Sequence, residues 1–496
     1  MAAHIEDQQT GHQKAIYQQA AVLLHSADWL ILGLIVLVAF AVRIYNLGSF
    51  PDTVLADEAD NAQSAVRILY GQPPANGFFG FDWTPQPAFS VYKEAAFIAI
   101  FGFNILAMRL PSAVLSALAL VPFYLLLRRQ LSITASALAT ILLGTNVWYL
   151  NFSRSGWNNV DVCFYLLMAM LFLLLAIDAV AAAENRPRLK WIYFAAAGTF
   201  CALGLYGYPS GRTITLGVVA FLPIALLFYR KHWKTLLKGY ALLFTVAALL
   251  FAPQAAYIAR NWELFNGRSN VVLILNSPEY KADSAATMRQ QLLRNLRGPW
   301  DGPVNNTPQY SPVGEPQLDR VAGLLALLGM ALTFALGRLR RQAATWLWWL
   351  MLLSGWSVTQ LLTTSTPNGA RGVGYMPTLL FFAGVGLAAI ERGLIYLAAR
   401  GSPKGSLAQM ARPLAITALA AAICAAGYAN VRHYVEWQNK PHTRMERYLY
   451  VTEREFPEWS AMIVELARNK GGATNVGDWR NAHPIQDREN PYGVSP

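Results

Sequence analysis

A cluster of carboxylates follows the first long apolar segment of the chain. The loop that begins at Phe50 reads FPDTVLADEADNAQSA and contains Asp57, Glu58 and Asp60. A carboxylate can act as general base on a hydroxyl or amine when that acceptor is held within hydrogen-bonding distance. On a helix, Asp57 and Asp60 share a face and Glu58 points about 100° away. The same residues could cap a helix and complement its dipole, and capping does not exclude catalysis.

Three isolated arginines lie at the ends of later apolar segments. They are Arg154 in NFSRSGW, Arg212 in GYPSGR and Arg371 in PNGARG. A guanidinium group grips phosphate through paired, charge-assisted hydrogen bonds, so these side chains are candidates to hold a lipid phosphate. The alternative for each is a contact with anionic headgroups or with the acidic loop.

The composition indicates a multi-pass membrane protein. Of 496 residues, 55% are hydrophobic and only 14% are charged, and the mean hydropathy is +0.30. A net charge of +12 would suggest nucleic acid in a soluble protein, but here the basic residues fall in short loops, so no nucleic-acid partner is expected. The three cysteines, Cys163, Cys201 and Cys424, have no paired spacing and no nearby histidine cluster, which argues against disulfides and a cysteine metal site.

About eleven segments meet the requirement of roughly 20 apolar residues for a transmembrane helix. They cover residues 28–46, 108–127, 132–150, 160–180, 191–208, 212–229, 236–258, 320–337, 343–362, 372–390 and 412–430. The sequence therefore predicts an all-α polytopic fold. Residues 1–27 carry no cleavage pattern, so the first segment is expected to be a retained anchor.

The positive-inside rule gives one orientation for all these segments. A cytoplasmic N-terminus places five basic loops inside, among them Arg128-Arg129, Arg338/Arg340/Arg341 and Arg392/Arg400/Lys404/Arg412. The long loops 47–107 and 259–319 then lie outside. We expect a plasma (inner) membrane protein with a transmembrane domain over 28–430 and an extracytoplasmic tail over 431–496, with any chemistry on the outer face.

The first outer loop is expected to hold two helices. Residues 57–70 can form an amphipathic helix, and Phe89–Phe101 is apolar but too short to span, which is typical of a helix lying at the interface. The stretch between them is rich in Gly, Pro and aromatic residues and is expected to be irregular. The tail is polar and carries Trp437, Trp459 and Trp479, so we expect it to pack loosely on the outer face.

The order of these motifs resembles the polyprenyl-phosphate-sugar glycosyltransferases of the C-type fold, which include the protein O-mannosyltransferases and the lipid A aminoarabinose transferases. The matching residues are Asp57-Glu58-Ala59, Phe101-Gly102-Phe103, Arg109-Leu110-Pro111-Ser112-Ala113, Phe152-Ser153-Arg154, Gly204-Leu205-Tyr206-Gly207-Tyr208 and Pro367-Asn368-Gly369-Ala370-Arg371. The resemblance covers roughly residues 28–390. The last three of these segments are similar to uncharacterised bacterial members of the superfamily.

The resemblance implies an inverting transfer of a sugar from a polyprenyl phosphate to an acceptor on the outer face. It places the general base on Asp57, with Glu58 as orienter or sugar contact, and a phosphate contact on Arg154 and near Arg371. One departure concerns the Pro-rich loop, where several members have a charged residue before Pro-Pro and this chain has Gln86-Pro87-Ala88. Asp60, Asp82 and Lys93 are secondary candidates; Asp82 and Lys93 could replace the missing contact, and Asp82 could also be a turn residue.

These residue types suit the implied reaction. The departing phosphate needs cations, and the acceptor needs one carboxylate to take its proton as the anomeric carbon is attacked from the opposite side. No cofactor is required by this scheme; the acidic cluster could bind a divalent metal weakly, but none is indicated. The expected partners are the polyprenyl-phosphate sugar, a lipid, glycan or protein acceptor, and membrane lipids.

Three other functions are compatible with a membrane protein of this composition. A transporter or flippase of lipid-linked or polar solutes would carry charges near the bilayer midplane. Most of the apolar segments have no charged residue apart from Asp178, which lies near a predicted cytoplasmic end. An O-antigen-type ligase or polymerase would gather arginines in one outer loop, as Arg268, Arg289, Arg294 and Arg297 do. A non-catalytic scaffold would tolerate loss of Asp57. The identity of the sugar, the acceptor and the carrier length is not fixed by the sequence.

Overall fold

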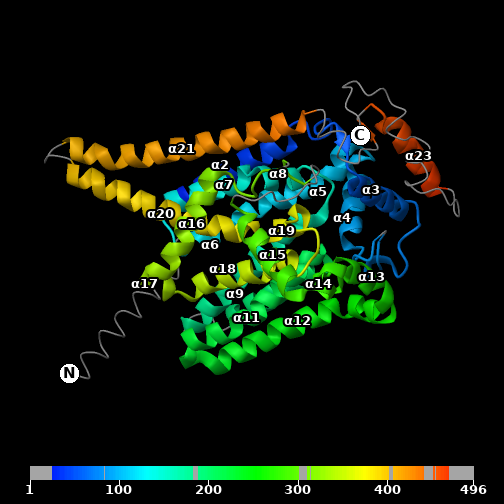
Figure 1. Ribbon diagram of the computed structural model, residues 1–496, viewed down its shortest axis with the longest axis horizontal. Helices are drawn as coiled ribbons and strands as arrows, with labels where there is room; N and C mark the ends of the chain where they lie inside the picture. Colours follow the sequence, from blue (N-terminus) through cyan, green and yellow to red (C-terminus); the bar gives the residue numbers. More distant parts are fainter. Residues whose placement is uncertain are drawn as a thin grey trace.

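The computed structural model is an all-α polytopic bundle in which many helices run along the long axis of the molecule (Figure 1). It describes residues 25–82, 84–182, 188–300, 310–312, 314–401, 406–440, 451–452 and 454–468. The predicted cytoplasmic segment 1–27 lies almost entirely outside the described residues, as do Trp479 and Lys404.

Each apolar segment predicted from the sequence is helical. These helices are α2 (Ser26–Ile44), α5 (Ile105–Leu118) with α6 (Leu120–Arg128), α7 (Ile133–Thr145) with α8 (Val147–Ser153), α9 (Asp161–Ala181), α10 (Leu189–Tyr206), α11 (Arg212–Phe228), α12 (Trp233–Arg260), α16 (Arg320–Ala335), α18 (Ala343–Trp356), α20 (Met376–Gly401) and α21 (Ser406–Gln438). Within the described ranges, eight helical segments are long and apolar enough to cross a membrane, and the bent pair α7 and α8 would make nine. Because α16 and α18 are shorter, the total of about eleven crossings stays a prediction.

Polar side chains define where several of these helices start and bend. Asn104 and Ser132 accept hydrogen bonds from the backbone N–H groups of Ala107 and Ala135, at 2.9 and 3.1 Å, and so cap α5 and α7. Asn146 caps α8 at a 59° break from α7. The Gly144 carbonyl next to this break accepts a hydrogen bond from Arg43 Nη1 at 3.1 Å.

The remaining elements form the loops. In the first outer loop, α3 (Ala56–Leu69) and α4 (Phe89–Phe101) confirm both helices predicted there, with the short turn η1 (Gly77–Phe79) between them. The second outer loop holds α13 (Trp262–Val272), η5 (Ile274–Asn276), α14 (Pro278–Ala282) and α15 (Ser284–Arg297). Short elements join the bundle helices: η2 (Asn158–Val160), η3 (Pro209–Gly211), η4 (Arg230–His232), α17 (Gly337–Arg340), the π-turn η6 (Ser357–Leu361), α19 (Gly369–Gly372) and η7 (Val373–Tyr375).

The loop elements separate into two ends of the bundle. In Figure 1, α3, α4 and α13 gather at the right-hand end, whereas the basic turn α17 lies at the left-hand end. This separation agrees with the charge pattern of the sequence. Which end faces the cytoplasm remains a prediction from the positive-inside rule.

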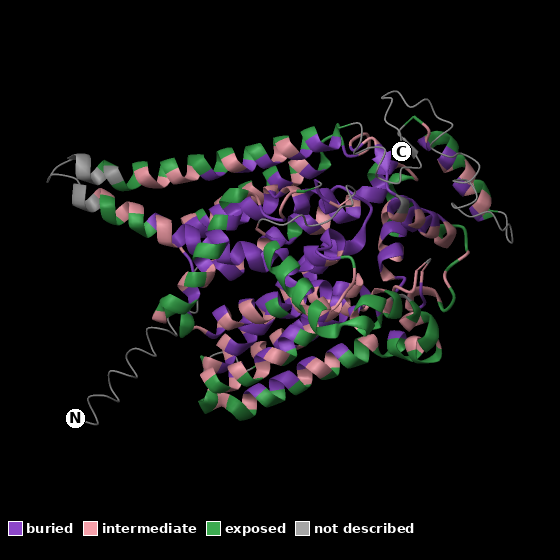
Figure 2. Ribbon diagram, in the orientation of Figure 1, coloured by how far each residue is buried: buried purple, intermediate pink, exposed green. Residues whose placement is uncertain are grey.

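The main core lies around α9 and α20. Of the best apolar window in each helical segment, 78% is buried for α9 and 89% for α20, but only 17% for α12 and for α21 (Figure 2). The outermost helices therefore present an apolar surface of the kind that lipid covers. A second, smaller core joins α3, α4 and the start of α5.

The C-terminal tail completes this second core. Its described part consists of β2 (Val451–Thr452), which pairs antiparallel with β1 (Thr53–Val54), and α23 (Phe456–Arg468), which packs on α3. Trp459 is fully buried. The expectation of a loosely packed tail is therefore wrong for α23. The bundle helix α21 also continues to Gln438, past the predicted boundary at residue 430.

Candidate functional site

A buried ion pair between Glu58 and Arg109 organises the start of α3. Glu58 Oε1 accepts hydrogen bonds from Arg109 Nε at 2.7 Å and from the Gly156 N–H at 2.8 Å. Its Oε2 accepts from the Leu55 N–H at 3.1 Å and from Arg109 Nη2 at 3.3 Å. The two side chains are 0% and 1% exposed. Every oxygen of this carboxylate thus has two donors, as a buried charge requires.

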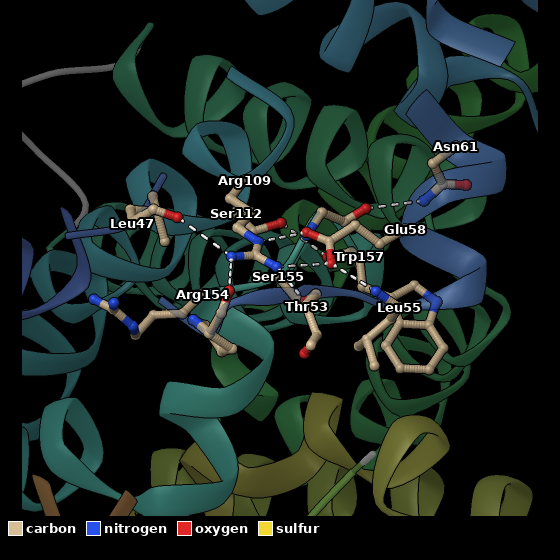
Figure 3. Close-up of polar contacts among 12 residues, drawn as sticks. Leu47, Thr53, Leu55, Glu58, Asn61, Arg109, Ser112, Arg154, Ser155 and Trp157 are labelled. Atoms are coloured by element: carbon tan, nitrogen blue, oxygen red, sulfur yellow. Dashed lines mark hydrogen bonds and ion pairs between the residues drawn. The ribbon is translucent and has the colours of Figure 1, made fainter. Parts of the chain in front are cut away.

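Arg109 also fixes the chain segment that leads into α3. Its guanidinium donates to the carbonyl oxygens of Pro51 and Thr53, each at 2.7 Å, and of Leu47 at 3.3 Å. Figure 3 shows these contacts around one guanidinium group. The RLP motif at the start of the second apolar segment therefore holds the acidic loop in place. In the sequence this motif is visible only as part of the resemblance, and its role in holding the loop was not predicted.

The predicted acids of the loop differ in their accessibility. Asp57 and Asp60 are half-buried on α3, and Asp82 is half-buried in the loop before α4. Glu58, in contrast, is enclosed by Arg109, Gly156 and Leu55, so it cannot touch a substrate in this conformation. The catalytic or sugar-contacting role expected for Glu58 is not supported, whereas a role in orienting α3 is compatible with its contacts.

The Arg154 guanidinium is bound to backbone carbonyls of the protein itself. Its Nη1 donates to the carbonyls of Val42 and Arg43 at 2.6 and 2.7 Å, and its Nη2 donates to Tyr45 and Phe50 at 2.9 and 2.8 Å. The guanidinium thereby caps the carboxyl end of α2 and points away from the Glu58 carboxylate (Figure 3). Because both terminal nitrogens bind backbone carbonyls, the predicted phosphate contact of Arg154 is not supported.

The segment that follows Arg154 connects the elements at this end of the bundle. Asn61 of α3 donates to the Gly156 carbonyl at 3.0 Å, and Ser112 of α5 donates to the Trp157 carbonyl at 2.9 Å. These bonds attach α3 and α5 to residues 155–157 (Figure 3).

Two asparagines of η2 extend the same connection to α4 and α19. Asn158 donates to Ser90 Oγ at 3.0 Å, and Asn159 donates to the Ala370 carbonyl at 2.8 Å. Ala370 is the neighbour of Arg371, so residues 156–159 bring the acidic helix and the Arg371 turn to one region.

Arg371 lies in a short, locally stabilised turn. The side chain of Asn368 caps α19 by accepting from the Arg371 N–H at 3.0 Å, and Arg371 Nη1 donates to the Thr364 carbonyl at 2.7 Å. The side chain is half-buried.

A second charged pair joins α4 to the start of α9. Lys93 forms an ion pair with Asp161, and their side chains are 15% and 2% exposed. Asp161 Oδ1 is buried without a hydrogen-bond partner among the described residues. Lys93 was a secondary candidate from the sequence; Asp161 was not recognised there because a lone carboxylate at the start of an apolar segment is also typical of a helix N-terminus.

Glu94 is a buried acid that sequence analysis also missed. It is 4% exposed, and within the described chain its Oε1 has no hydrogen-bond donor. Burial raises the pKa of the Glu94 carboxyl well above its usual value, and the charge of Glu58 adds to this effect. The signal available in the sequence was a charged Lys-Glu pair in the middle of an otherwise apolar helix.

Arg212 lines an apolar cavity of about 310 Å³ at the carboxyl ends of α10 and α12 and the amino end of α11. The other lining residues are Pro87, Leu205, Phe251, Ala255, Ile258, Ala259, Trp262 and Phe265. The guanidinium lies 4.6 Å from the centre of the Phe265 ring. No residue of the described segments forms a hydrogen bond or ion pair with the Arg212 side chain, which is only half-buried. This cation therefore has unused donors that face an apolar space.

The cavity contacts the irregular stretch between α3 and α4 through Pro87 and aromatic residues. Pro87 comes from the irregular stretch between α3 and α4. Phe81 of the same stretch stacks on Phe265, with ring centres 6.0 Å apart, and contacts Tyr257 at 5.0 Å. The loop that carries Asp82 thus forms one wall of the Arg212 cavity. For the described part of the chain, no group of three or more His, Cys, Asp and Glu residues is arranged to hold a metal ion.

Sequence comparisons identify relatives of part of this chain. Residues 86–257, about a third of the sequence, match the family described as dolichyl-phosphate-mannose-protein mannosyltransferase. The undecaprenyl phosphate-alpha-4-amino-4-deoxy-L-arabinose arabinosyl transferase of Pseudomonas aeruginosa is 30% identical over 205 residues, which are 40% of this chain and 34% of the relative. The corresponding protein of Pseudomonas paraeruginosa is 28% identical over 42% of this chain and 38% of its own length. The chain thus matches little more than a third of these relatives.

Structural comparisons extend over most of the chain. ArnT from Cupriavidus metallidurans bound to undecaprenyl phosphate aligns with a TM-score of 0.51 and 15% identity, covering 90% of this chain and 76% of ArnT. The archaeal oligosaccharyltransferase AglB from Archaeoglobus fulgidus aligns with a TM-score of 0.57 and 15% identity, covering 91% of this chain and 61% of AglB. At such identities the likeness shows the fold alone. The predicted C-type glycosyltransferase fold and the resemblance to this superfamily are confirmed.

Proposed function

We propose that this protein is an integral membrane glycosyltransferase. It transfers a sugar from a polyprenyl-phosphate donor to an acceptor at the end of the bundle that carries α3, with inversion at the anomeric carbon. The observation that carries the proposal is the Arg212 cavity, where a guanidinium with unused donors faces an apolar space beside the stretch that carries Asp82. An isoprenoid phosphate matches this site, because it carries an anionic phosphate on an apolar chain. The names of the relatives, which act on undecaprenyl or dolichyl phosphates, support the same donor class.

In this proposal the donor lies across the outer ends of α10 to α12. Arg212 binds the phosphate through charge-assisted hydrogen bonds, and the apolar walls of the cavity take the first isoprene units. Arg371 is the next cation, since η2 connects its turn to α4. Lys93 of α4 stays a secondary candidate because it is paired with Asp161. Arg154 is left out because backbone carbonyls occupy its terminal nitrogens.

Asp57 acts as the general base. Its carboxylate takes the proton of the acceptor hydroxyl or amine as the acceptor atom forms a bond to the anomeric carbon. The bond between that carbon and the phosphate oxygen breaks, and its electron pair leaves with the polyprenyl phosphate. Arg212 stabilises the charge that grows on the departing oxygens. The proposal assigns no step to a metal ion and keeps Asp60 and Asp82 as secondary acids near the acceptor.

Glu58 and Arg109 position the base in this scheme. Asp57 is in the first turn of α3, next to Glu58, whose carboxylate is attached to α5 and to residue 156. Side chains on the same helical turn inherit the position of the backbone, so the ion pair sets where Asp57 lies relative to the donor cavity. A carboxylate misplaced by about 1 Å can lose on the order of 100-fold in rate.

The test is transfer from defined donors in proteoliposomes. Undecaprenyl phosphate-linked 4-amino-4-deoxy-L-arabinose and dolichyl-phosphate mannose are supplied with a bacterial envelope extract, and release of the free lipid phosphate is measured because any acceptor yields it. We expect release from at least one donor, and a loss of about 10²–10⁴-fold for Asp57→Asn with unchanged donor binding. Asp52→Asn, a half-buried carboxylate in the same loop, is the matched control.

Two results would overturn the proposal. Full transfer by a folded Asp57→Asn variant would remove Asp57 as the base. Binding of both donors without any release of lipid phosphate by the wild type would favour a carrier of lipid-linked sugars over an enzyme.

A further inference from the structure

The described part of the C-terminal tail packs on α3 and contacts the chain just before and just after that helix. We define the C-terminal clamp as β2 and α23 together. One stripe of α23, made by Phe456, Trp459, Ile463 and Ala467, is buried with at most 7% exposure. This spacing of three to four residues is that of one face of a helix. The stripe belongs to the same small core as the inner face of α3.

The inner face of α3 is built from small residues. Ala59, Ala62 and Ala65 are fully buried, and Trp459 packs in the same core with 0% exposure. Alanines let a partner helix approach closely but offer few contacts of their own. A helix of 14 residues is marginal in isolation, so α3 depends on what packs against it. The large rings of α23 provide that packing from one side, and α4 provides it from another.

The clamp also holds both ends of α3. At the start, β2 pairs with β1 so that Thr452 lies opposite Thr53 and Val451 opposite Val54. The Thr53 carbonyl oxygen accepts the hydrogen bond from Arg109 described above, so the ladder fixes the segment between the Arg109 contact and the first turn of α3.

At the far end, the chain just beyond α3 binds the last residues of α23. Gln72 Nε2 donates to the Ala467 carbonyl at 2.6 Å, and the Arg468 guanidinium lies 5.3 Å from the centre of the Tyr70 ring. With the ladder at its start and these contacts at its end, α3 cannot shift along or rotate about its axis without breaking contacts to the clamp.

We propose that the C-terminal clamp is a positioning element for the proposed transfer reaction, and that Trp459 is its principal positioning residue. It holds α3 in the placement that aligns Asp57 with the donor. The inference rests on the proposed function. Trp459 acts through packing, because its indole N–H has no acceptor within the described residues. Its ring lies 5.6 Å from that of Phe103 and 5.3 Å from that of Phe456.

The donor cavity is built without the clamp. Its lining residues come from α10 to α13 and from Pro87, and none belongs to α3 or α23. Loss of the clamp should therefore slow transfer without weakening donor binding. A general loss of stability would reduce both the rate of transfer and the binding of the donor. The two measurements together therefore separate a positioning role from a stabilising one.

The experiment compares Trp459→Ala with Trp459→Phe in the full-length chain. We measure turnover as release of lipid phosphate, binding of undecaprenyl phosphate, and hydrogen exchange of the α3 amides. Trp459→Ala should lower kcat about 10–100-fold and leave the undecaprenyl phosphate Kd within about twofold, because a displacement of about 1 Å costs rate rather than donor affinity. Trp459→Phe keeps a ring in the core and should restore kcat to within about threefold. Glu465→Ala, at an exposed position of the same helix, is the matched control.

Hydrogen exchange separates this inference from the proposed function. If the wild type transfers no sugar, the proposed enzyme activity fails, but faster exchange of α3 in Trp459→Ala would still show that the clamp holds α3. Unchanged α3 exchange, or faster exchange with full kcat, would overturn the positioning role. Loss of donor binding in parallel with kcat would also overturn it, in favour of a general stabilising role. If Trp459→Ala does not fold, Trp459→Leu provides the same comparison with a smaller loss of packing.

Discussion

The Glu58–Arg109 centre and the Arg212 cavity use arginine in opposite ways. Arg109 is 1% exposed, and its donors are met by a carboxylate and by backbone carbonyls of the loop before α3. Arg212 is half-buried, contacts the ring of Phe265, and has no acceptor among the residues that the structure describes. The first arrangement fixes the protein's own backbone, while the second leaves a cation ready for an anion from outside.

The difference lies in the acceptors that surround each guanidinium. Arg154 resembles Arg109 in this respect, because α2 ends where its guanidinium can take four carbonyl oxygens. A helix carboxyl end is a good partner for a cation, so an arginine near one is easily committed to structure. Arg212 instead begins α11, where the nearest helix end offers N–H groups and not carbonyls.

The largest expected effect concerns the Glu58–Arg109 centre. Arg109→Leu leaves the Glu58 carboxylate buried without its counter-charge, and we expect a loss of about 3–5 kcal/mol in the free energy of unfolding. The midpoint of thermal unfolding in detergent micelles measures this loss.

A double variant sharpens the same prediction. Glu58→Met combined with Arg109→Met removes both charges and should recover part of the stability, because no uncompensated charge remains. A single Arg109→Leu variant within about 1 kcal/mol of the wild type would contradict the role given to this ion pair.

Much of the fold follows from the sequence because apolar length and helix periodicity are local signals. The two helices of the first outer loop were predicted, and Phe89–Phe101 has the predicted bounds. The binding of the Arg154 guanidinium to backbone carbonyls was not predictable. Its acceptors include the carbonyls of Val42 and Phe50, which are more than a hundred residues away in sequence. The packing of α23 on α3 was missed for the same reason: its partners are nearly four hundred residues away.

The candidate site was predictable only in part. Residue types and order brought attention to Asp57, Lys93, Arg212 and Arg371, and the hydrogen bonds of Asn158 and Asn159 show how the turns near them are joined. The Lys93-Glu94 pair was visible in the sequence, but the burial of Glu94 could not be predicted, because an acid in an apolar helix is also compatible with an exposed face. Burial is a property of the packed molecule, so its effect on a carboxyl group appears only with the neighbours in place.

An intermediate effect separates Arg154 from Arg212. Arg154→Ala should lower the free energy of unfolding by about 1.5–3 kcal/mol, since four backbone carbonyls in the last turn of α2 and just after it lose a charged donor. Arg212→Ala should change stability by less than about 1 kcal/mol but weaken undecaprenyl phosphate binding about 10–100-fold, the loss of one charge-assisted contact. Thermal unfolding and a lipid-binding titration on both variants measure the two effects.

The roles given to the two arginines are wrong if Arg154→Ala weakens lipid binding or if Arg212→Ala leaves it unchanged. Weak lipid binding by a stable Arg154→Ala variant would restore the phosphate contact expected from the sequence. Normal lipid binding by Arg212→Ala would remove the cavity from the donor site. Arg212→Lys retains the charge and should bind undecaprenyl phosphate with intermediate affinity, because an ammonium lacks the forked donors of a guanidinium.

The last prediction is a pH dependence from Glu94, a buried acid of α4. Burial raises the pKa of this carboxyl in the folded protein above its usual 4.5, so the folded state binds a proton that the unfolded chain releases. Stability from this group is therefore fully present below about pH 4.5 and is lost as pH rises through the raised pKa. Glu94→Gln keeps the neutral form at every pH and should become more stable than the wild type as pH rises, by up to about 1.4 kcal/mol per pH unit within that window. Thermal unfolding of both proteins between pH 4 and 8 measures the difference, with Glu465→Gln on the exposed face of α23 as control.

The contrary result is a stability difference between the wild type and Glu94→Gln that stays constant with pH. It would show that the charged form of Glu94 gains compensating contacts in the folded protein. Glu94 would then resemble Glu58, whose charge is satisfied, more than Arg212, whose donors are unused.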